Sequence, residues 1–317
     1  MNRRQFIQNS LSTGAALSAT VWLGGRSDAL SQTAVFPKRV LGKTGEKLSI
    51  IGFGGIVVRD ETPESSANLV AWAVDHGINY FDVAPTYGNA QDRLGPALKP
   101  YRKNCFLACK TTQRRKEEAD KELHESLRKL ETDHFDLYQL HALSSMEDTE
   151  RAFGPHGAME AVVKARQDGK IRFIGFSAHS EEGALLAMEQ FDFDTILMPI
   201  NFVCWMKGQF GPRAVAKAKE KGMGILALKA MAHTRLDRSR PNPYPKMWYT
   251  PIEDESLVHL SLRFTLSQGT TAAIPPGYGD WLKKAVRLMA DDRPLTAEEN
   301  GILVKAAQEV EPLFALV

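Results

Sequence analysis

From about Lys38 onward, short apolar runs alternate along the chain with longer segments of helical periodicity. The runs are rich in branched and aromatic residues, whereas the segments between them place apolar side chains three and four positions apart. Alternating strand and helix units of this kind build parallel sheets, because each helix returns the chain to start the next strand. We expect eight strands, at residues 48–53, 79–83, 105–110, 135–141, 173–177, 195–201, 224–229 and 271–275.

Turn residues separate these elements. Gly77, Gly169 and Gly222 follow three of the expected helices, where a glycine readily adopts the left-handed conformation that ends a helix. Residues 39–48 predict a hairpin ahead of the first barrel strand, with its turn at residues 44–45. The chain is thus divided into regular units without a long interruption before residue 233.

Two folds fit this alternation, an open doubly wound sheet and a closed eight-stranded barrel. An open sheet would favour a G-x-G-x-x-G turn after its first strand, but Val57 occupies the position of the third glycine in the run that starts at Gly52. Polar residues instead gather at the strand ends, and a barrel assembles its site there. We therefore expect an α/β fold in which residues 35–317 form a single (β/α)8 TIM barrel with a short N-terminal hairpin.

Composition limits the size and the partners of this domain. The 317 residues are 43% hydrophobic, enough for one large core, and the net charge of +2 comes from dispersed basic and acidic residues. We therefore expect no nucleic-acid partner. Cys105 and Cys109 would lie roughly 13 Å apart on one extended strand, too far for a disulfide, so with Cys204 they predict no disulfide framework.

The N-terminus differs from the rest of the chain. Arg3 and Arg4 precede a weakly apolar stretch at residues 11–25 and then small residues, a pattern that resembles a bacterial twin-arginine (Tat) export signal. We interpret residues 1–34 as this signal peptide and linker, although an ordinary basic amphipathic N-terminus also fits. The interpretation implies the Tat export machinery as a partner and a periplasmic or otherwise exported protein. The stretch is shorter than the about 20 apolar residues of a membrane span, so we expect no stable membrane insertion of the mature protein.

Four polar side chains fall at the ends of three successive expected strands: Asp82 with Tyr87 just past it, Lys110, and His141. Each has a structural explanation when taken singly, as a helix cap, a packed loop residue, a solvated lysine or an interior histidine. Together they favour a site, because a lysine inside a barrel mouth needs a carboxylate and Asp82 is the available partner. We expect Lys110 to lower the pKa of the Tyr87 phenol, so that Tyr87 can exchange a proton while His141 hydrogen-bonds a substrate oxygen.

Segments 81–88, 107–111, 136–141 and 169–177 place these residues in contexts that resemble the aldo-keto reductase family. The resemblance extends from about residue 41 to about residue 288. It implies a barrel that transfers a hydride between a nicotinamide cofactor, usually NADPH with NAD possible, and a small-molecule carbonyl or alcohol substrate. By this resemblance Tyr87 is the general acid and base, Lys110 tunes it, Asp82 holds Lys110, and His141 orients the substrate.

The resemblance also suggests residues that bind the cofactor. They are Gly55, Ser177, Asn201, Lys229, Pro275, Gly277, Lys283 and Lys284. Residues 178–179 replace an asparagine that many members carry, and residues 197–201 lack the family's glutamine and stacking aromatic, although Phe202 or Trp205 could supply a ring. The two consecutive lysines also fit an exposed helix face.

Ile56, Trp205 and Trp248 are expected to form the substrate wall. Trp248 lies in the irregular segment 233–250, which predicts either a functional loop or a packed surface insertion. The departures at the cofactor positions leave an alternative function, an exported barrel with altered or lost nicotinamide binding that acts as a non-enzymatic binding protein. A metal hydrolase is disfavoured and no metal site is expected, because no strand carries an H-x-H pair or a similar compact ligand set.

Overall fold

The computed structural model describes residues 36–239 and 241–316. Eight parallel strands of this part form one sheet in the order β12-β9-β8-β7-β6-β5-β4-β3. The strands are β3 (Phe53–Gly54), β4 (Tyr80–Asp82), β5 (Phe106–Thr111), β6 (Phe135–Leu143), β7 (Ile171–Ala178), β8 (Thr195–Pro199), β9 (Gly224–Leu228) and β12 (Ala272–Ile274). Each pairs with its neighbour in chain order, as repeated strand and helix units require.

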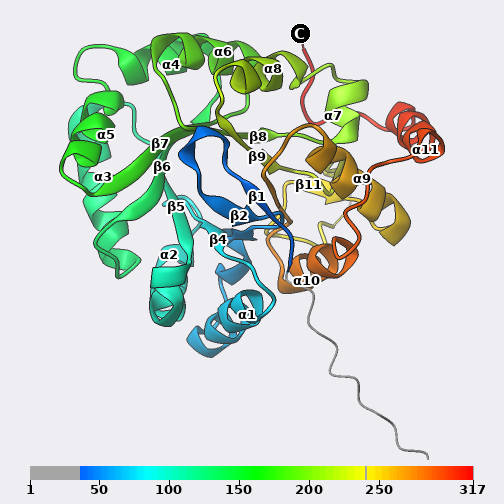
Figure 1. Ribbon diagram of the computed structural model, residues 1–317, viewed down its shortest axis with the longest axis horizontal. Coiled ribbons are helices and arrows are strands. Elements are labelled where there is room, and N and C mark those ends of the chain that lie inside the picture. Colours follow the sequence, from blue (N-terminus) through cyan, green and yellow to red (C-terminus); the bar gives the residue numbers. More distant parts are fainter. Residues whose placement is uncertain (1–35, 240, 317) are drawn as a thin grey trace, which may run out of the picture. The chain divides into compact units, whose positions relative to one another are not determined.

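The sheet closes on itself through the residues just before β3. Ile51 forms a parallel bridge with Ala273 of β12, and the amide of Gly52 donates to the carbonyl of Ala273 at 3.0 Å. The structure is therefore the expected (β/α)8 barrel, with helices arranged around the strands (Figure 1).

Helices follow the strands around the outside of the barrel, and several begin at side-chain caps such as Thr62, Ser145 and Asp254. They are α1 (Pro63–Asp75), α2 (Ala90–Leu98), α3 (Lys116–Lys129), α4 (Met146–Phe153), α5 (Ala158–Gln167), α6 (Glu181–Gln190), α7 (Phe202–Met206), α8 (Pro212–Glu220), α9 (Glu255–Ser267), α10 (Gly279–Leu288) and α11 (Ala297–Gln308). The three predicted helix-ending glycines have φ values of 82°, 72° and 65°, which confirms their left-handed conformation.

An antiparallel hairpin of β1 (Lys38–Val40) and β2 (Lys47–Ser49) lies across the barrel (Figure 1). It closely approaches the start of β9, where Gly42 has φ +49° and an added Cβ would lie 2.3 Å from the amide nitrogen of Gly224. The predicted first strand, residues 48–53, was wrong at its start. Leu48 and Ser49 pair with β1 in the hairpin, so the barrel strand begins only after them.

Strand periodicity decides which side chains face the barrel interior. On β4, the interior residue Tyr80 is followed two positions later by Asp82, and on β5 Phe106 and Ala108 are followed by Lys110. Nearer the amino-terminal ends of the strands, the barrel interior is apolar and includes two leucines of the hairpin segment. The buried residues there are Leu41, Leu48, Tyr80, Phe106, Ala108, Leu137, Leu197, Leu226, Ala272 and Ile274. The alternation therefore places the polar side chains of Asp82 and Lys110 inward near the carboxyl ends of their strands.

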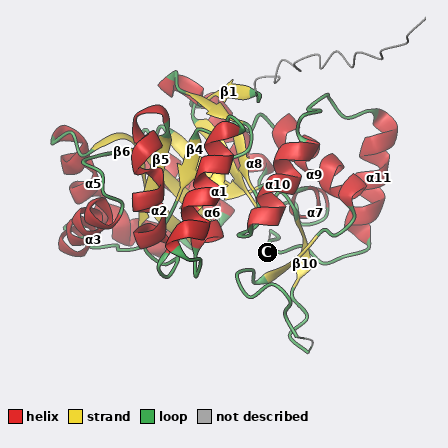
Figure 2. Cartoon of the chain, turned by 90° about the horizontal axis from the view of Figure 1, so that it is seen from below, coloured by secondary structure: helices red, strands yellow, loops and turns green. Residues whose placement is uncertain are grey.

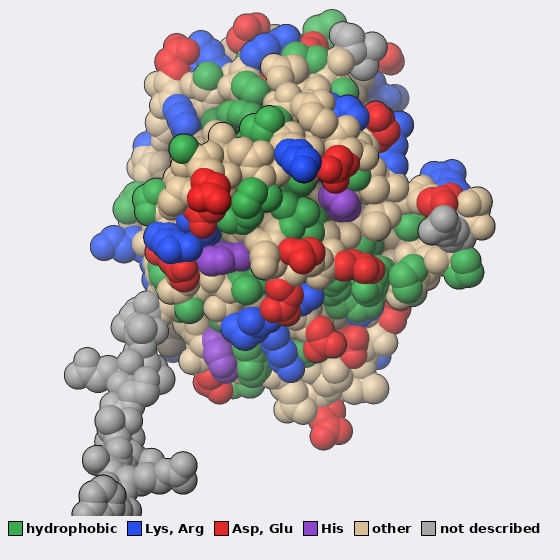
Figure 3. Space-filling view, turned by 90° about the vertical axis from the view of Figure 1, so that its right-hand side faces the viewer, with side chains coloured by type: hydrophobic (Ala, Val, Ile, Leu, Met, Phe, Trp, Pro, Cys, Tyr) green, Lys and Arg blue, Asp and Glu red, His purple; other side chains and the backbone are tan. Residues whose placement is uncertain are grey.

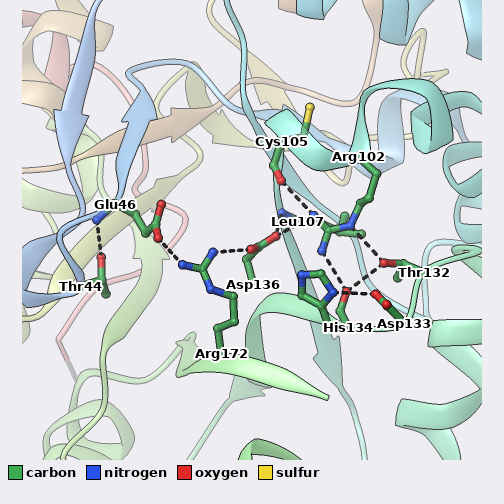
Figure 4. Close-up of polar contacts among 10 residues, drawn as sticks. All are labelled: Thr44, Glu46, Arg102, Cys105, Leu107, Thr132, Asp133, His134, Asp136 and Arg172. Atoms are coloured by element: carbon green, nitrogen blue, oxygen red, sulfur yellow. Dashed lines mark hydrogen bonds and ion pairs between the residues drawn. The ribbon is translucent and has the colours of Figure 1, made fainter. Parts of the chain in front are cut away.

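Below this apolar layer, an ion-pair network joins the hairpin to two strand starts and to the 3-10 helix η3 (Lys99–Asn104) (Figure 4). Asp136 is buried and accepts hydrogen bonds from Arg102 at 2.9 Å, Arg172 at 2.6 Å and the amide of Leu107 at 2.9 Å. Arg172 also pairs with Glu46 of the hairpin. One carboxylate thus holds three segments together at this end of the barrel.

Replacing Asp136 should destabilise the barrel. Asp136→Ala removes the carboxylate partner of Arg102 and the acceptor of the Leu107 amide, and we expect the free energy of unfolding to fall by about 3 kcal/mol. Guanidinium chloride denaturation measures this loss. The control is Asp133→Ala, at a side chain that is 91% exposed, where we expect a change within about 0.5 kcal/mol. Equal losses in the two variants would contradict the role of the network.

The predicted signal peptide and linker, residues 1–34, lie outside the described residues. Within the described part, no helix has both the length and the apolar character needed to cross a membrane. Basic and acidic side chains are interspersed on the face shown in Figure 3.

Candidate functional site

The site is organised around an ion pair at the carboxyl ends of β4 and β5. The Lys110 ammonium pairs with one carboxylate oxygen of Asp82 and donates to the carbonyl of Val83 at 3.2 Å. Both side chains are almost fully buried, each residue being 1% exposed. Burial opposes the charge of Lys110, but Asp82 and Tyr87 outweigh it, so the pKa of Lys110 is raised and the ammonium persists.

The second oxygen of Asp82 is held from inside the barrel. It accepts hydrogen bonds from the Tyr80 hydroxyl at 3.2 Å and from the Gln139 amide at 3.0 Å. A carboxylate that accepts from three donors is fixed in orientation. Lys110 is therefore anchored by a partner that cannot turn away from it.

Tyr87 lies beside this pair. The Lys110 nitrogen is 5.7 Å from the centre of the Tyr87 ring. Burial raises the pKa of Tyr87, Lys110 lowers it, and Asp82 raises it, with a net result above the ordinary value. The sequence correctly predicted the direction in which Lys110 acts, but the expected net lowering was wrong because burial outweighs the lysine. Tyr87 therefore keeps its proton at neutral pH, which suits a proton donor.

His141 faces Tyr87 from β6, with ring centres 6.1 Å apart and planes at 83°. Burial, Lys110 and His179 lower the pKa of His141 to about 3, so the imidazole is neutral at pH 7. Arg114 donates to the His141 carbonyl at 2.6 Å and pairs with Asp148, which fixes the backbone from which the ring projects.

A cavity of about 370 Å³ opens at this end of the barrel. Its wall combines strand ends with the segment that follows β10 (Ala232–Arg235) and precedes β11 (Tyr249–Pro251), which projects from the barrel on the side opposite the β1–β2 hairpin (Figure 2). The lining residues are Gly54, Ile56, Arg59, Asp82, Thr86, Tyr87, His141, His179, Leu228, Lys229, Pro245, Lys246, Met247, Trp248, Tyr249, Ile274, Pro275, Pro276 and Gly277. The segment around Trp248 is thus part of the site, although its two ends pair as strands instead of being irregular.

The structure brings many of the predicted residues to this cavity. Besides Asp82, Tyr87 and His141, these are Ile56, Trp248, Lys229, Pro275 and Gly277. Lys110 lies directly behind the wall, in contact with Asp82.

Other predicted residues have structural partners away from the cavity. Ser177 accepts a hydrogen bond from the amide of Ala142 at 2.7 Å. Asn201 caps α7 and donates to the carbonyl of Lys229 at 3.2 Å. Both side chains support neighbouring backbone instead of lining the wall.

The remaining predicted residues also lie outside the wall. Gly55 packs against Val83, and Trp205 packs against Phe264. Lys283 and Lys284 sit on α10 beside a different surface hollow.

The sequence interpretation missed several wall residues. His179 directly follows β7, and His141 lies near the carboxyl end of β6, so a search for polar residues at strand ends would have found His179 as well. Arg59 and Lys246 come from loops whose course the hydrophobic pattern does not reveal, and no comparable signal marks them. Lys246 reaches the wall because it pairs with Glu61 at 3.0 Å and donates to the carbonyl of Val57 at 3.1 Å.

A closed parallel barrel with a buried ammonium–carboxylate pair, a protonated phenol and a neutral imidazole at its carboxyl-terminal mouth defines a protein equipped for proton transfer. The sequence profile of the aldo/keto reductase family matches residues 50–276. The chain belongs to the aldo/keto reductase family.

Similar proteins agree with this assignment. L-galactose dehydrogenase of Arabidopsis thaliana is 31% identical over 156 residues, which are 44% of this chain and 47% of that protein. The aldo-keto reductase YhdN of Bacillus subtilis is 32% identical over 161 residues, which are 44% of this chain and 46% of that protein. The chain therefore spans about half the length of these relatives in each match.

Solved structures share the fold. An aldo-keto reductase from Bacillus halodurans in its holo form superposes with a TM-score of 0.68 at 24% identity, covering 89% of this chain and 98% of that chain. A Bombyx mori aldo-keto reductase in complex with NADP gives a TM-score of 0.64 at 19% identity, covering 86% and 93%. These likenesses establish the barrel architecture independently of the family profile.

The neutral histidines predict how stability depends on pH. Burial first, then nearby cations, lowers the pKa of His141 to about 3, and burial and Lys229 lower that of His179 to about 4. The unfolded chain takes up protons at histidine below about pH 6.5, whereas these two folded side chains do not. Stability should therefore be lower at pH 5 than at pH 7.

Chemical denaturation at both pH values tests this expectation. The double variant His141→Asn/His179→Asn should show a smaller decrease in unfolding free energy between pH 7 and pH 5. The variant His124→Gln, at an exposed histidine of α3, should behave like the parent. An unchanged decrease in the double variant would mean that these two histidines are charged in the folded protein.

Proposed function

We propose that the protein is a nicotinamide-dependent aldo-keto reductase that transfers a hydride between NADPH and a carbonyl or alcohol substrate. The observation that carries the proposal is the buried Lys110–Asp82 pair placed beside Tyr87 on the cavity wall. Family membership supports it, since this pair and His141 occupy the segments that match the family.

In the direction of reduction, the substrate carbonyl oxygen would lie between Tyr87 and His141. When bound at this wall, NADPH would supply the hydride for the carbonyl carbon. Tyr87 gives its proton to the oxygen, and Lys110 stabilises the phenolate that remains. His141 is neutral, so it can donate one N–H to the same oxygen and stabilise developing negative charge without competing for the proton.

Features of the wall fit a nicotinamide nucleotide. Pro275 and Gly277 lead into α10, whose N-cap residue Tyr278 makes no side-chain capping hydrogen bond. The first amides of α10 thus remain available for a phosphate group, which helix N-termini bind well. Gly277 also packs so closely on Ile56 that an added Cβ would lie 2.5 Å from a methyl carbon, so backbone and not side chain forms the wall there.

Tyr87→Phe tests the proposed proton donor. The substitution removes only the hydroxyl, and we expect turnover with NADPH and an aldehyde to fall by about a hundredfold or more while folding is unchanged. The control is Tyr101→Phe, at a half-buried tyrosine of η3 on another part of the barrel. Steady-state kinetics and circular dichroism provide the readouts. Undiminished turnover in Tyr87→Phe would remove Tyr87 from this role.

A second candidate function is a binding protein with altered or lost nicotinamide affinity. Two observations favour it. The side chains of Ser177 and Asn201 accept hydrogen bonds from neighbouring backbone amides, and Lys283 and Lys284 lie beside another hollow. Titration of the protein with NADPH and with NADH separates the two candidates, because the reductase requires saturable binding of at least one of them.

We further propose that the N-terminal segment directs Tat-dependent export of the folded enzyme. The support is the twin-arginine pattern at Arg3 and Arg4. Replacing both with lysine should abolish the exported form, as followed by cell fractionation and immunoblotting, whereas Arg26→Lys in the same segment should have no effect. Equal export of the two variants would contradict a twin-arginine signal.

A further inference from the structure

Lys229 is a charged residue of the cavity wall that the proposed mechanism does not use. It directly follows β9, with φ +65°, and lines the same wall as Tyr87 and His141. Its backbone is fixed, because its carbonyl accepts hydrogen bonds from the Asn201 amide at 3.2 Å and the amide of Ala232 at 2.9 Å. The side chain therefore projects from a rigid point at the mouth of the barrel.

The Lys229 ammonium has no anionic partner among the described residues. Lys110 pairs with Asp82, and Lys246, the other lysine on the wall, pairs with Glu61. Lys229 instead lies over two aromatic rings, 5.3 Å from the centre of Trp248 and 5.1 Å from the centre of Tyr249. Such contacts stabilise a cation but do not neutralise it.

No other described lining residue supplies a negative charge that would balance the Lys229 ammonium. Asp82 is the one carboxylate among the lining residues, and Lys110 already neutralises it. Arg59 pairs with Asp60, and His141 and His179 contribute no negative charge. The described wall therefore carries an excess positive charge located at Lys229.

The effect of Lys229 on nearby pKa values shows that its charge lies close to His141. Lys229 lowers the pKa of both His141 and His179. Burial, with a contribution from Lys110, lowers the pKa of Lys229 itself to about 8. A desolvated ammonium of this kind gains stability from a bound anion.

We propose that Lys229 binds an anionic group of the substrate, so that the preferred substrates are carbonyl compounds that carry a carboxylate. The aromatic surfaces of Trp248 and Tyr249 beside the ammonium fit a ring or another flat apolar part between the carbonyl and the carboxylate. This substrate class rests on the proposed reductase function. The α10 N-terminus offers a separate place for cofactor phosphate. Lys229 is thus assigned to the substrate instead of to the cofactor contact that the resemblance suggested.

Two isosteric aldehydes test the proposal, 4-carboxybenzaldehyde and its neutral amide, 4-formylbenzamide. In Lys229→Met we expect KM for the carboxylate to rise by about tenfold or more, because a charge-assisted contact is lost. KM for the amide should change less than about twofold, and Lys229→Arg should largely restore the preference.

The matched control is Lys217→Met, which makes the same change in net charge on α8, where Lys217 pairs with Glu220 at 3.0 Å. It should leave the ratio of the two KM values unchanged. Equal KM changes for both aldehydes in Lys229→Met would overturn the proposal. So would a tenfold loss of NADPH affinity with an unchanged ratio, because that result assigns Lys229 to the cofactor.

Calorimetric titration with benzoate and benzamide separates this inference from the reductase proposal. Benzoate should bind the parent protein more tightly than benzamide does, and Lys229→Met should abolish the difference. If the difference is found but no aldehyde is reduced with NADPH or NADH, the anion site stands and the reductase function fails. If benzoate binds no better than benzamide to the parent protein, the anion site is refuted whatever the activity.

Discussion

The structure depends on keeping one deeply buried lysine charged at the mouth of the barrel. An isolated ammonium would lose its proton or destabilise the fold there, because desolvation costs far more than the barrel can offset. Asp82 prevents this, and Tyr80 and Gln139 hold Asp82 in turn. The positive charge beside Tyr87 is therefore a property of three strands and not of one side chain.

The barrel separates this polar end from an apolar middle and from a second polar network at the opposite end. At the lower end Asp136 joins Arg102, Arg172 and the hairpin, and side chains such as Leu137 and Leu197 fill the space between. Closure of the sheet through Ile51 brings the first and last strands together. The groups at the mouth can thus converge from strands far apart in the sequence.

Much of the fold was predictable because the barrel repeats one simple unit. Three successive apolar strands carry a polar residue near the carboxyl end, so the candidate residues Asp82, Lys110 and His141 could be found from position alone. The first strand was misplaced at its start, since a hairpin strand and a barrel strand adjoin there without a polar break. A search for polar residues at the carboxyl ends of strands would also have found His179.

The hydrophobic pattern could not predict the course of the loops or the balance of opposing effects on a pKa. Arg59 donates to the Pro245 carbonyl and Lys246 pairs with Glu61, long-range contacts that no local pattern encodes. Asn201 was assigned by resemblance, yet its amide supports the backbone of Lys229. The net pKa of Tyr87 depends on how deeply the ring is buried as well as on its neighbours, and burial is known only once the side chains are placed.

The most direct test of the account is the pKa of Tyr87, followed by nuclear magnetic resonance of a carbon-13 label on the tyrosine ring. The protein should show a higher Tyr87 pKa when Lys110 is replaced by methionine. The Tyr87 pKa in the double variant Asp82→Asn/Lys110→Met should also be higher than in the parent protein, because Lys110 affects the phenol more strongly than Asp82 does. An unchanged or lower Tyr87 pKa without Lys110 would contradict the claim that the buried ammonium controls the phenol.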